Sequence, residues 1–224
     1  MTQLMTKKTL VSAILFAGIQ VATAANAQAG WYSESTLLDA DVSGTSLNST
    51  GRNVNAEFES DTAFGGAIGY QYDGGLRIEA EYLSTENDTS AIVFNGNSFS
   101  GNTVAGSLET QSIFVNAIKS FGNSSIQPYL GVGIGFSKVE SNIAYNPTLS
   151  ASINDDDTAF SYQFLAGIDV PFSKSFTGFV EYRYVDISDV SLSRRGGGPG
   201  GVATTSQNGD IDFDAFAVGL RYSF

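Results

Sequence analysis

Strict alternation of apolar with small or polar residues at the end of the chain limits that stretch to a β-strand. After Asp214 the even positions are all apolar: Phe216, Val218, Leu220, Tyr222 and Phe224. The odd positions between them are Ala215, Ala217, Gly219, Arg221 and Ser223. A period of two places one set on each face of a strand. Aromatic residues on one face and an arginine on the other fit a barrel with lipid outside and polar groups inside.

Seven further segments show the same alternation, so the chain is predicted to contain eight strands. They cover residues 31–40, 63–72, 76–82, 112–121, 128–137, 160–170 and 177–184. Segment 112–121 is partly apolar on both faces, and its predicted outward residues are Ile113, Val115, Ala117 and Phe121. In segment 128–137 three successive inward positions are glycines, Gly131, Gly133 and Gly135. Glycine there leaves room for long side chains from neighbouring strands.

The connections between these segments alternate between short and long. Three are short turns, at 73–75, 122–125 and 171–175, and Asp73-Gly74-Gly75 has the tight-turn chemistry of a hairpin. Four are long polar stretches, at 41–61, 84–107, 139–157 and 187–210, which we expect to be loops. This layout predicts an all-β fold, an eight-stranded antiparallel up-and-down transmembrane β-barrel with four long extracellular loops and three short periplasmic turns. Tyr72, Phe121 and Tyr222 would form an aromatic girdle near the turns. A soluble, lipocalin-like periplasmic barrel is the alternative.

Residues 1–29 are predicted to be a cleaved signal peptide, leaving 30–224 as the barrel. Lys7 and Lys8 precede an apolar run from Leu10 to Ile19, and Ala27-Gln28-Ala29 is a small-residue cleavage motif. Cleavage after Ala22-Thr23-Ala24 and retention as a membrane anchor are the alternatives, but the apolar run is too short to span a bilayer. We therefore expect export across the inner membrane to the cell outer membrane.

Composition excludes several classes of function. The chain has 11 Lys and Arg against 23 Asp and Glu, with no Cys and no His. Removal of Lys7 and Lys8 leaves nine basic residues and a net charge of −14. This acidity argues against nucleic-acid binding. The absence of His and Cys removes the usual catalytic bases and thiolate ligands, so we expect no enzyme, no cofactor and no metal site.

Short motifs along the mature chain give it a recognisable family character. They are Gly30-Trp31-Tyr32, Asn116 with Phe121-Gly122, Gln127 to Gly133, Tyr162-Gln163, Glu181 to Tyr184, and Leu220 to Phe224. In this order the motifs resemble the small bacterial outer-membrane β-barrel family, which includes OmpA-like barrels, porin-family proteins and surface antigens. The resemblance implies outer-membrane lipid, lipopolysaccharide and the barrel-assembly machinery as partners. It also implies that Leu220, Tyr222 and Phe224 form the C-terminal assembly signal.

Eight charged residues occupy strand positions whose side chains are predicted to point into the barrel, and they are the main candidate site. They are Glu34, Arg77, Glu79, Glu81, Asp169, Glu181, Arg183 and Arg221. Charges at lipid-facing positions would be costly, so an inward placement is expected. We expect the three arginines to reach Glu79, Glu81 and Glu181, closing the lumen with a surplus of negative charge. The network would be structural, or it would gate a narrow pore.

Two polar features of the long stretches suggest weaker sites. Asp155-Asp156-Asp157 would bind a divalent cation or, as we favour, form a solvated acidic loop. Arg194 and Arg195 would contact lipopolysaccharide phosphates or belong to a mobile glycine-rich loop tip.

These features together predict a non-enzymatic outer-membrane barrel with a structural or surface-contact role. The alternatives are a low-conductance diffusion pore and an adhesin or surface antigen that binds a host or matrix ligand through its loops.

Overall fold

The computed structural model describes residues 29–49, 52–59, 61–94, 96–122, 125–145, 151–198 and 201–224. The predicted signal peptide lies almost entirely outside these ranges. The strands are β1 (Gly30–Ser49), β2 (Arg52–Phe58), β3 (Asp61–Gln71), β4 (Leu76–Phe94), β5 (Asn97–Ser100), β6 (Val104–Ser120), β7 (Gln127–Tyr145), β8 (Ala151–Pro171), β9 (Phe176–Gly198) and β10 (Gly201–Ser223). A 3-10 turn, Gly101–Thr103, follows β5. Within the described ranges, no helix is long and apolar enough to cross a membrane.

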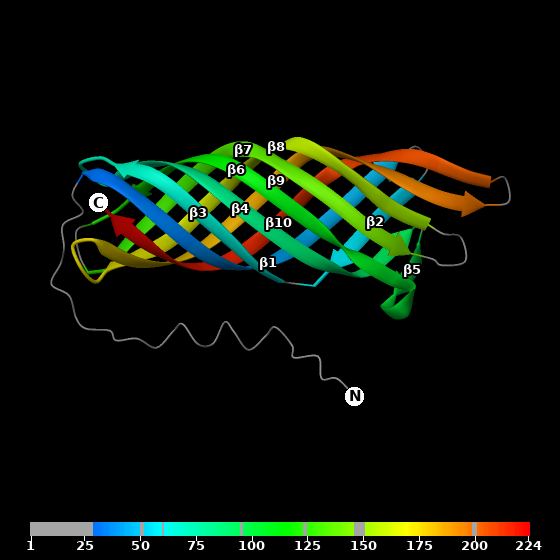
Figure 1. Ribbon diagram of the computed structural model, residues 1–224, viewed down its shortest axis with the longest axis horizontal. Coiled ribbons are helices and arrows are strands. Elements are labelled where there is room, and N and C mark those ends of the chain that lie inside the picture. Colours follow the sequence, from blue (N-terminus) through cyan, green and yellow to red (C-terminus); the bar gives the residue numbers. More distant parts are fainter. Residues whose placement is uncertain are drawn as a thin grey trace, which may run out of the picture.

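The strands close into one antiparallel barrel (Figure 1). β1 pairs with β10 on one side, from Tyr32 opposite Ser223, and with β3 on the other, from Gly30 opposite Gln71. β2 and β3 both lie between β1 and β4, so together they take the place of one strand in the barrel wall, with a break between them. β5 pairs with β4 alone and lies off the ring. The wall therefore has eight positions, and the predicted fold class is confirmed.

The predicted loops are wrong over most of their length, because the strands continue through them. β7 extends to Tyr145, β8 begins at Ala151, and the two stay paired from Gln127 opposite Asp169 to Tyr145 opposite Ala151. On β7, Lys138, Glu140 and Asn142 face outward, whereas Val139, Ser141 and Ile143 point into the barrel. A strand whose outer face meets water carries polar residues there, so its composition resembles that of a loop. The β7–β8 and β9–β10 connections are long β-hairpins, whereas β4 leaves β6 after Asp88 and continues in pairs with β2 and β5.

The short turns are confirmed where the structure describes them. β3 and β4 are joined through Gly74 and Gly75, with φ angles of 84° and 83°. Glycine adopts this left-handed conformation without the steric penalty of a Cβ atom. β8 ends at Pro171 and β9 begins at Phe176. The turn between β6 and β7 has Gly122 at φ 82°, and positions 123–124 lie outside the described residues.

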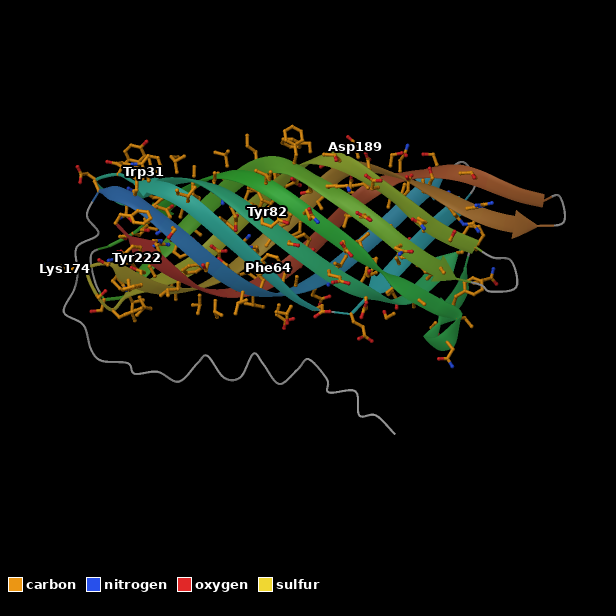
Figure 2. All side chains as sticks on the ribbon, viewed as in Figure 1. Trp31, Phe64, Tyr82, Lys174, Asp189 and Tyr222 are labelled. Atoms are coloured by element: carbon orange, nitrogen blue, oxygen red, sulfur yellow. The ribbon has the colours of Figure 1, made fainter. Side chains whose placement is uncertain are left out.

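The predicted facing of the strands is confirmed. Trp31, Ile113 and Val132 are more than half exposed on the outside, and Phe114 and Ile118 are buried inside. Tyr72, Phe121 and Tyr222 are exposed at the turn end, where Tyr70 packs edge-on against both Trp31 and Tyr72. A second row of aromatic contacts crosses the middle of the barrel: Phe64–Tyr82, Phe136–Phe160 and Tyr182–Phe216. In Figure 2, Trp31 and Tyr222 lie at the turn end and Phe64 and Tyr82 near mid-length. The apolar band between these two girdles is the membrane-facing surface.

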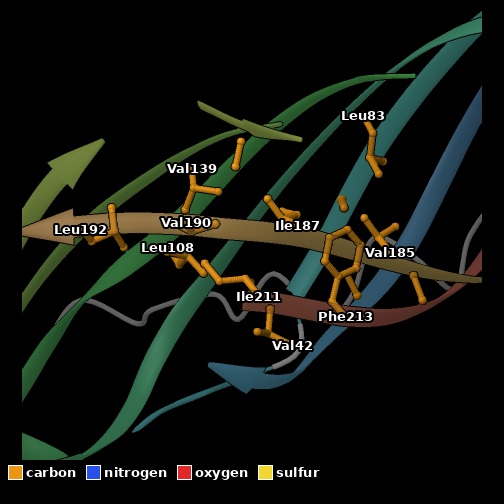
Figure 3. Packing of buried hydrophobic residues seen from close by; sticks show 14 of the residues in the cluster. Val42, Leu83, Leu108, Val139, Val185, Ile187, Val190, Leu192, Ile211 and Phe213 are labelled. Carbon is orange, nitrogen blue, oxygen red and sulfur yellow. The ribbon is translucent and has the colours of Figure 1, made fainter. Parts of the chain in front are cut away.

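The interior has two sections of different character. At the level of the membrane-facing band it is polar and charged. Beyond the second girdle it is an apolar core that includes Leu108, Val139, Ile187, Leu192 and Phe213 (Figure 3). This apolar section lies largely beyond the membrane-facing band, where the outer wall is polar. It therefore resembles the core of a soluble barrel, with apolar side chains withdrawn from water.

A bulge in β9 keeps its apolar residues inside. Val185 and Ile187 point inward before the bulge, and Val190 and Leu192 point inward after it. The inward-facing positions of β9 therefore change from odd to even residue numbers at the bulge. Asp189 lies between them with φ 59°, and the register with β10 shifts between Gly209 and Ile211. One extra residue in a strand re-aims every side chain that follows it. Without the bulge, Val190 and Leu192 would face water.

Candidate functional site

The eight predicted interior charges lie together inside the barrel, at the level of the membrane-facing band. We call them the lumen network: Glu34, Arg77, Glu79, Glu81, Asp169, Glu181, Arg183 and Arg221. Alternation within β1, β4, β8, β9 and β10 directs all eight side chains inward, and all are at least nine-tenths buried or engaged in buried contacts. Their roles remain predictions.

Asp169 is the meeting point of two arginines. Its Oδ2 lies 2.5 Å from Arg77 Nη1 and 3.0 Å from Arg221 Nη1, and its Oδ1 accepts a hydrogen bond of 3.1 Å from Arg221 Nη2. Arg221 also pairs through Nε with Glu34. The sequence predicted that these arginines would reach the glutamates of β4 and β9, but the barrel register brings them to Asp169 and Glu34 instead.

Arg183 holds two glutamates from opposite sides. Its Nη1 lies 2.8 Å from Glu81 Oε1, and its Nη2 lies 2.7 Å from Glu181 Oε1. Tyr129 Oη donates to the other oxygen of Glu181 over 2.8 Å. A buried guanidinium needs such partners because desolvation of an unpaired charge is costly. This half of the expected pairing is as predicted.

Glu79 is stabilised by neutral donors. Tyr32 Oη donates to Glu79 Oε2 over 2.7 Å, and Asn116 Nδ2 donates to Glu79 Oε1 over 2.9 Å. Among the described residues no arginine or lysine nitrogen is recorded within ion-pair distance of it. The expected pairing of an arginine with Glu79 is therefore wrong. Neutral hydrogen bonds allow a carboxylate to be buried without a matching cation.

Sequence reasoning missed the amides and phenols that complete the network. Gln163 Nε2 donates to Glu81 Oε2 over 2.7 Å and to Asn116 Oδ1 over 2.8 Å. Tyr32, Tyr129, Asn116 and Gln163 all have the inward parity, so alternation could have identified them.

The inward glycines of β7 accommodate this filling. A Cβ atom added at Gly131 would lie 2.8 Å from Ile118 Cγ1, and one at Gly133 would collide with Asn116. The predicted room for side chains from neighbouring strands is confirmed. At the turn end the lumen opens into a polar vestibule of about 330 Å³ lined by Gln71, Gln127, Asp169, Lys174 and Arg221, among others. The vestibule therefore ends on the charges of the lumen network.

The outer surface beyond the second girdle carries directly opposed acids. Glu86 on β4, Glu109 on β6, Glu140 on β7 and Asp156 on β8 occupy one cross-strand row, each directly opposite the next. All four are exposed, and Lys138 Nζ lies 3.4 Å from Glu140 and 3.5 Å from Asp156. Like charges that face each other across strands are destabilising. The surface beyond the girdle is therefore strongly anionic.

Replacing the middle residue of this row, Glu109→Lys, should stabilise the barrel by about 0.2–1 kcal/mol for each of its two cross-strand pairs. The gain should appear as a higher melting temperature in detergent at low salt and should shrink at high salt, because ions screen exposed charges. Asn142→Lys is the control, since Asn142 is exposed on β7 and lies opposite two neutral residues, Ser107 and Asn154. Equal melting temperatures for the two variants would show that the acidic row is energetically unimportant.

Asp155-Asp156-Asp157 is part of β8 rather than of a loop, so that prediction is wrong. Asp155 and Asp157 accept hydrogen bonds from the backbone of β9, and Asp156 faces Lys138. Within the described part of the chain, no cluster of three or more Asp or Glu side chains is arranged to hold a metal ion. The three aspartates therefore have hydrogen-bond or ion-pair partners on the neighbouring strands, which account for this acidic run without a cation.

Arg194 and Arg195 belong to β9 and point in opposite directions. Arg194 is 6% exposed and its guanidinium lies 4.1 Å from the centre of the Phe94 ring, inside the barrel. Arg195 is exposed. The hypothesis that both arginines contact lipopolysaccharide is wrong for Arg194, because the bulge at Asp189 sets its parity inward.

Comparison with known proteins agrees with this architecture. The family model of the outer membrane protein beta-barrel domain matches residues 9–224. The chain belongs to this family. It is an integral protein of the bacterial outer membrane. No curated protein sequence matches the chain at comparable significance.

Solved structures support the same fold at low sequence identity. OprG from Pseudomonas aeruginosa is 15% identical with a TM-score of 0.64, over 90% of this chain and 99% of that one. Neisserial surface protein A is 15% identical with a TM-score of 0.53, over 87% and 97%. A major outer membrane protein from Thermus thermophilus is 8% identical with a TM-score of 0.56, over 88% and 99%. At these identities the likeness of the outer-membrane barrel extends to the fold alone.

Proposed function

We propose that this outer-membrane barrel is a closed, non-enzymatic structural protein that presents a rigid anionic surface outside the cell. The observation that carries the proposal is the filled interior. The lumen network occupies the membrane level, and the apolar core of the hairpins lies above it. Ions would have to cross both a set of mutually bonded charges and a largely apolar section, which is unfavourable for an aqueous channel.

The chemistry of the interior also supports a non-enzymatic role. Ser112, Ser137 and Ser161 form a hydroxyl chain, with Oγ–Oγ separations of 2.7 and 2.9 Å. A serine nucleophile needs an adjacent general base, usually histidine, and the sequence has none. The chain of hydroxyls satisfies its own hydrogen bonds, so its simplest role is to support the packing of three neighbouring strands.

Contact with the membrane follows from the two girdles. Aromatic side chains at both ends of an apolar band anchor a barrel at the two interfaces of the bilayer. Leu220, Tyr222 and Phe224 are exposed on the outer face of β10, where lipid and the assembly machinery would both have access. We therefore propose outer-membrane lipid and the assembly machinery as its partners.

The closed-barrel function predicts very low conductance. Purified protein in planar bilayers should show rare, small currents at most, with any leak selective for cations because acids outnumber arginines five to three in the lumen network. A large, unselective conductance would contradict the proposal and favour the diffusion-pore alternative. A heat-modifiable gel shift in the same preparation is the control that the barrel is folded.

Surface contact is the second candidate, favoured by the length and charge of the hairpins. They continue well past the second girdle as paired strands, and their outer face carries the acidic row of Glu86, Glu109, Glu140 and Asp156. A basic host or matrix component would fit this surface. Shortening β7 and β8 in register should abolish binding to such a component while leaving membrane insertion intact. Unchanged binding would exclude these hairpins as the contact surface.

A further inference from the structure

The barrel wall is interrupted at one place between β8 and β9. The two strands are paired at Ile153–Arg194 and again at Ser161–Ile187, but between these points no pairing of residues is present and the register changes. On the other side of β8, pairing with β7 continues without a break through the same residues, from Ser141–Asp155 to Ser137–Ala159. The interruption therefore belongs to the β8–β9 contact alone. We call it the seam, residues 154–160 of β8 facing 188–193 of β9.

Carboxylates replace the missing backbone pairs in the seam. Asp155 Oδ2 accepts a hydrogen bond from the Ser193 N–H over 2.8 Å, and Asp157 Oδ2 accepts one from the Ser191 N–H over 2.7 Å. On the opposite edge of β9, Asp210 Oδ1 accepts the Asp189 N–H over 2.9 Å. Three alternate N–H groups of β9 are thus held by aspartates. Backbone N–H groups that have no partner strand are satisfied by side chains or by water, and here aspartates take that place.

The unequal lengths of the two strands across the seam explain why side chains are needed. Between the flanking pairs, β8 has seven residues (154–160) and β9 has six (188–193). The N–H groups of β9 are consequently out of step with the carbonyl groups of β8. An aspartate side chain can reach an N–H group that a backbone carbonyl, fixed in the strand, does not meet.

The seam is the boundary between the apolar section and the outside. Val190 and Leu192 of β9 are buried in the apolar core, as are Ile153 and Ala159 of β8 (Figure 3). Phe160 is at the end of the seam nearer the membrane and belongs to the second girdle. The seam therefore lies outside the membrane-facing band. Separation of the two strands would expose apolar side chains to the surroundings.

We propose that the seam is an acid-released section of the barrel wall, which the carboxylates of Asp155 and Asp157 close and which opens when Asp155 loses its charge. Ionised acceptors make hydrogen bonds roughly twice as strong as neutral ones. Protonation of Asp155 therefore weakens its bond to the Ser193 N–H. Backbone pairs, which hold the neighbouring β7–β8 contact throughout, are insensitive to pH, so release is confined to the seam.

The direction of the pH dependence follows from the stabilised charge. Hydrogen bonds from Ser193 hold the pKa of Asp155 below its ordinary value of 3.8. A carboxylate whose pKa is lower in the folded than in the unfolded state stabilises the fold fully at pH values above the unfolded pKa. This stabilisation is lost as the pH falls through the folded pKa. The seam should therefore be closed at neutral pH and should open only as the pH falls below 3.8. The surrounding charged groups are Asp156 on β8, Lys138 and Glu140 on β7, Asp189, Arg194 and Arg195 on β9, and Asp210 on β10.

The first test uses amide substitutions at neutral pH. Asp155→Asn with Asp157→Asn removes both charges and mimics the protonated state, whereas Asp156→Asn changes the intervening residue, whose side chain faces Lys138. Hydrogen–deuterium exchange of the folded protein in micelles should be about tenfold or more faster at the Ser191 and Ser193 amides in the double variant than in the wild type. Exchange in residues 176–184 should be unchanged in both variants. Equal exchange of the seam in the double variant and in Asp156→Asn would overturn the proposal.

The second test uses the wild-type protein and the absence of native cysteine. Protection factors, corrected for intrinsic exchange and measured at pH 7 and at a series of pH values from about 4 down to about 2, should fall in the seam and nowhere else once the pH is below 3.8. A single Val190→Cys substitution should be slow to react with a soluble thiol reagent at neutral pH and fast in the double-asparagine background. Loss of protection along the whole barrel at acid pH, or equal labelling of the cysteine in both backgrounds, would show that the seam is not a separately released unit.

Discussion

Arg183→Ala should destabilise the barrel by about 3–5 kcal/mol, the range for removing one partner of a buried ion pair. The guanidinium is in contact with both Glu81 and Glu181, at 2.8 and 2.7 Å. Without it, two buried carboxylates lose their cation, and Glu181 keeps only the Tyr129 hydroxyl as a recorded side-chain donor. Urea unfolding from lipid vesicles, followed by the fluorescence of the single tryptophan, Trp31, measures the change.

Neutralising the two glutamates that Arg183→Ala leaves without a cation provides the control for this effect. Adding Glu81→Gln and Glu181→Gln to Arg183→Ala should recover much of the lost stability, because the remaining groups are neutral. Lys119→Ala, at an exposed position near the turns, should change stability by no more than about 0.5 kcal/mol. Conductance should stay low in all three variants, since the apolar section above remains closed. Similar stability for Arg183→Ala and Lys119→Ala would mean that the lumen network contributes little.

Val132→Arg should cost about 2–4 kcal/mol, because it places a charge on the lipid-facing surface near the middle of the bilayer. Val132 lies on β7 between the two girdles and is 53% exposed. Ile168→Arg, on the neighbouring strand β8, should behave in the same way. The measurement is unfolding free energy in lipid vesicles, compared with the wild-type protein.

The matched control lies on the same strand and the same face. Asn142 of β7 is exposed beyond the second girdle, so Asn142→Arg should change stability by about 0.5 kcal/mol or less. Gly133→Arg also destabilises, but through collision with Asn116 inside the barrel, and its cost should persist in thinner bilayers. Equal tolerance of arginine at Val132 and Asn142 would mean that the membrane-facing band is misplaced.

The alternation of residues by itself determined much of this protein. It gave the number of wall positions, the facing of residues such as Val132 and Gly133, the three short turns and the inward placement of the eight charges. The physical reason is the lipid, which requires an unbroken apolar outer face and so leaves a strong period-two pattern between the girdles. Composition added the expectation of a non-enzymatic protein, since histidine and cysteine are both absent.

Only the tertiary structure decided how far the strands continue and which charges meet. Beyond the membrane the outer face is polar, so paired strands have the composition of loops, and the bulge at Asp189 reverses the parity in the middle of β9. The ion pair between Arg77 and Asp169 joins residues 92 positions apart, and it depends on the relative register of several strands around a closed ring. A local pattern specifies which face a side chain occupies, but the partner across a lumen is fixed only when the ring closes.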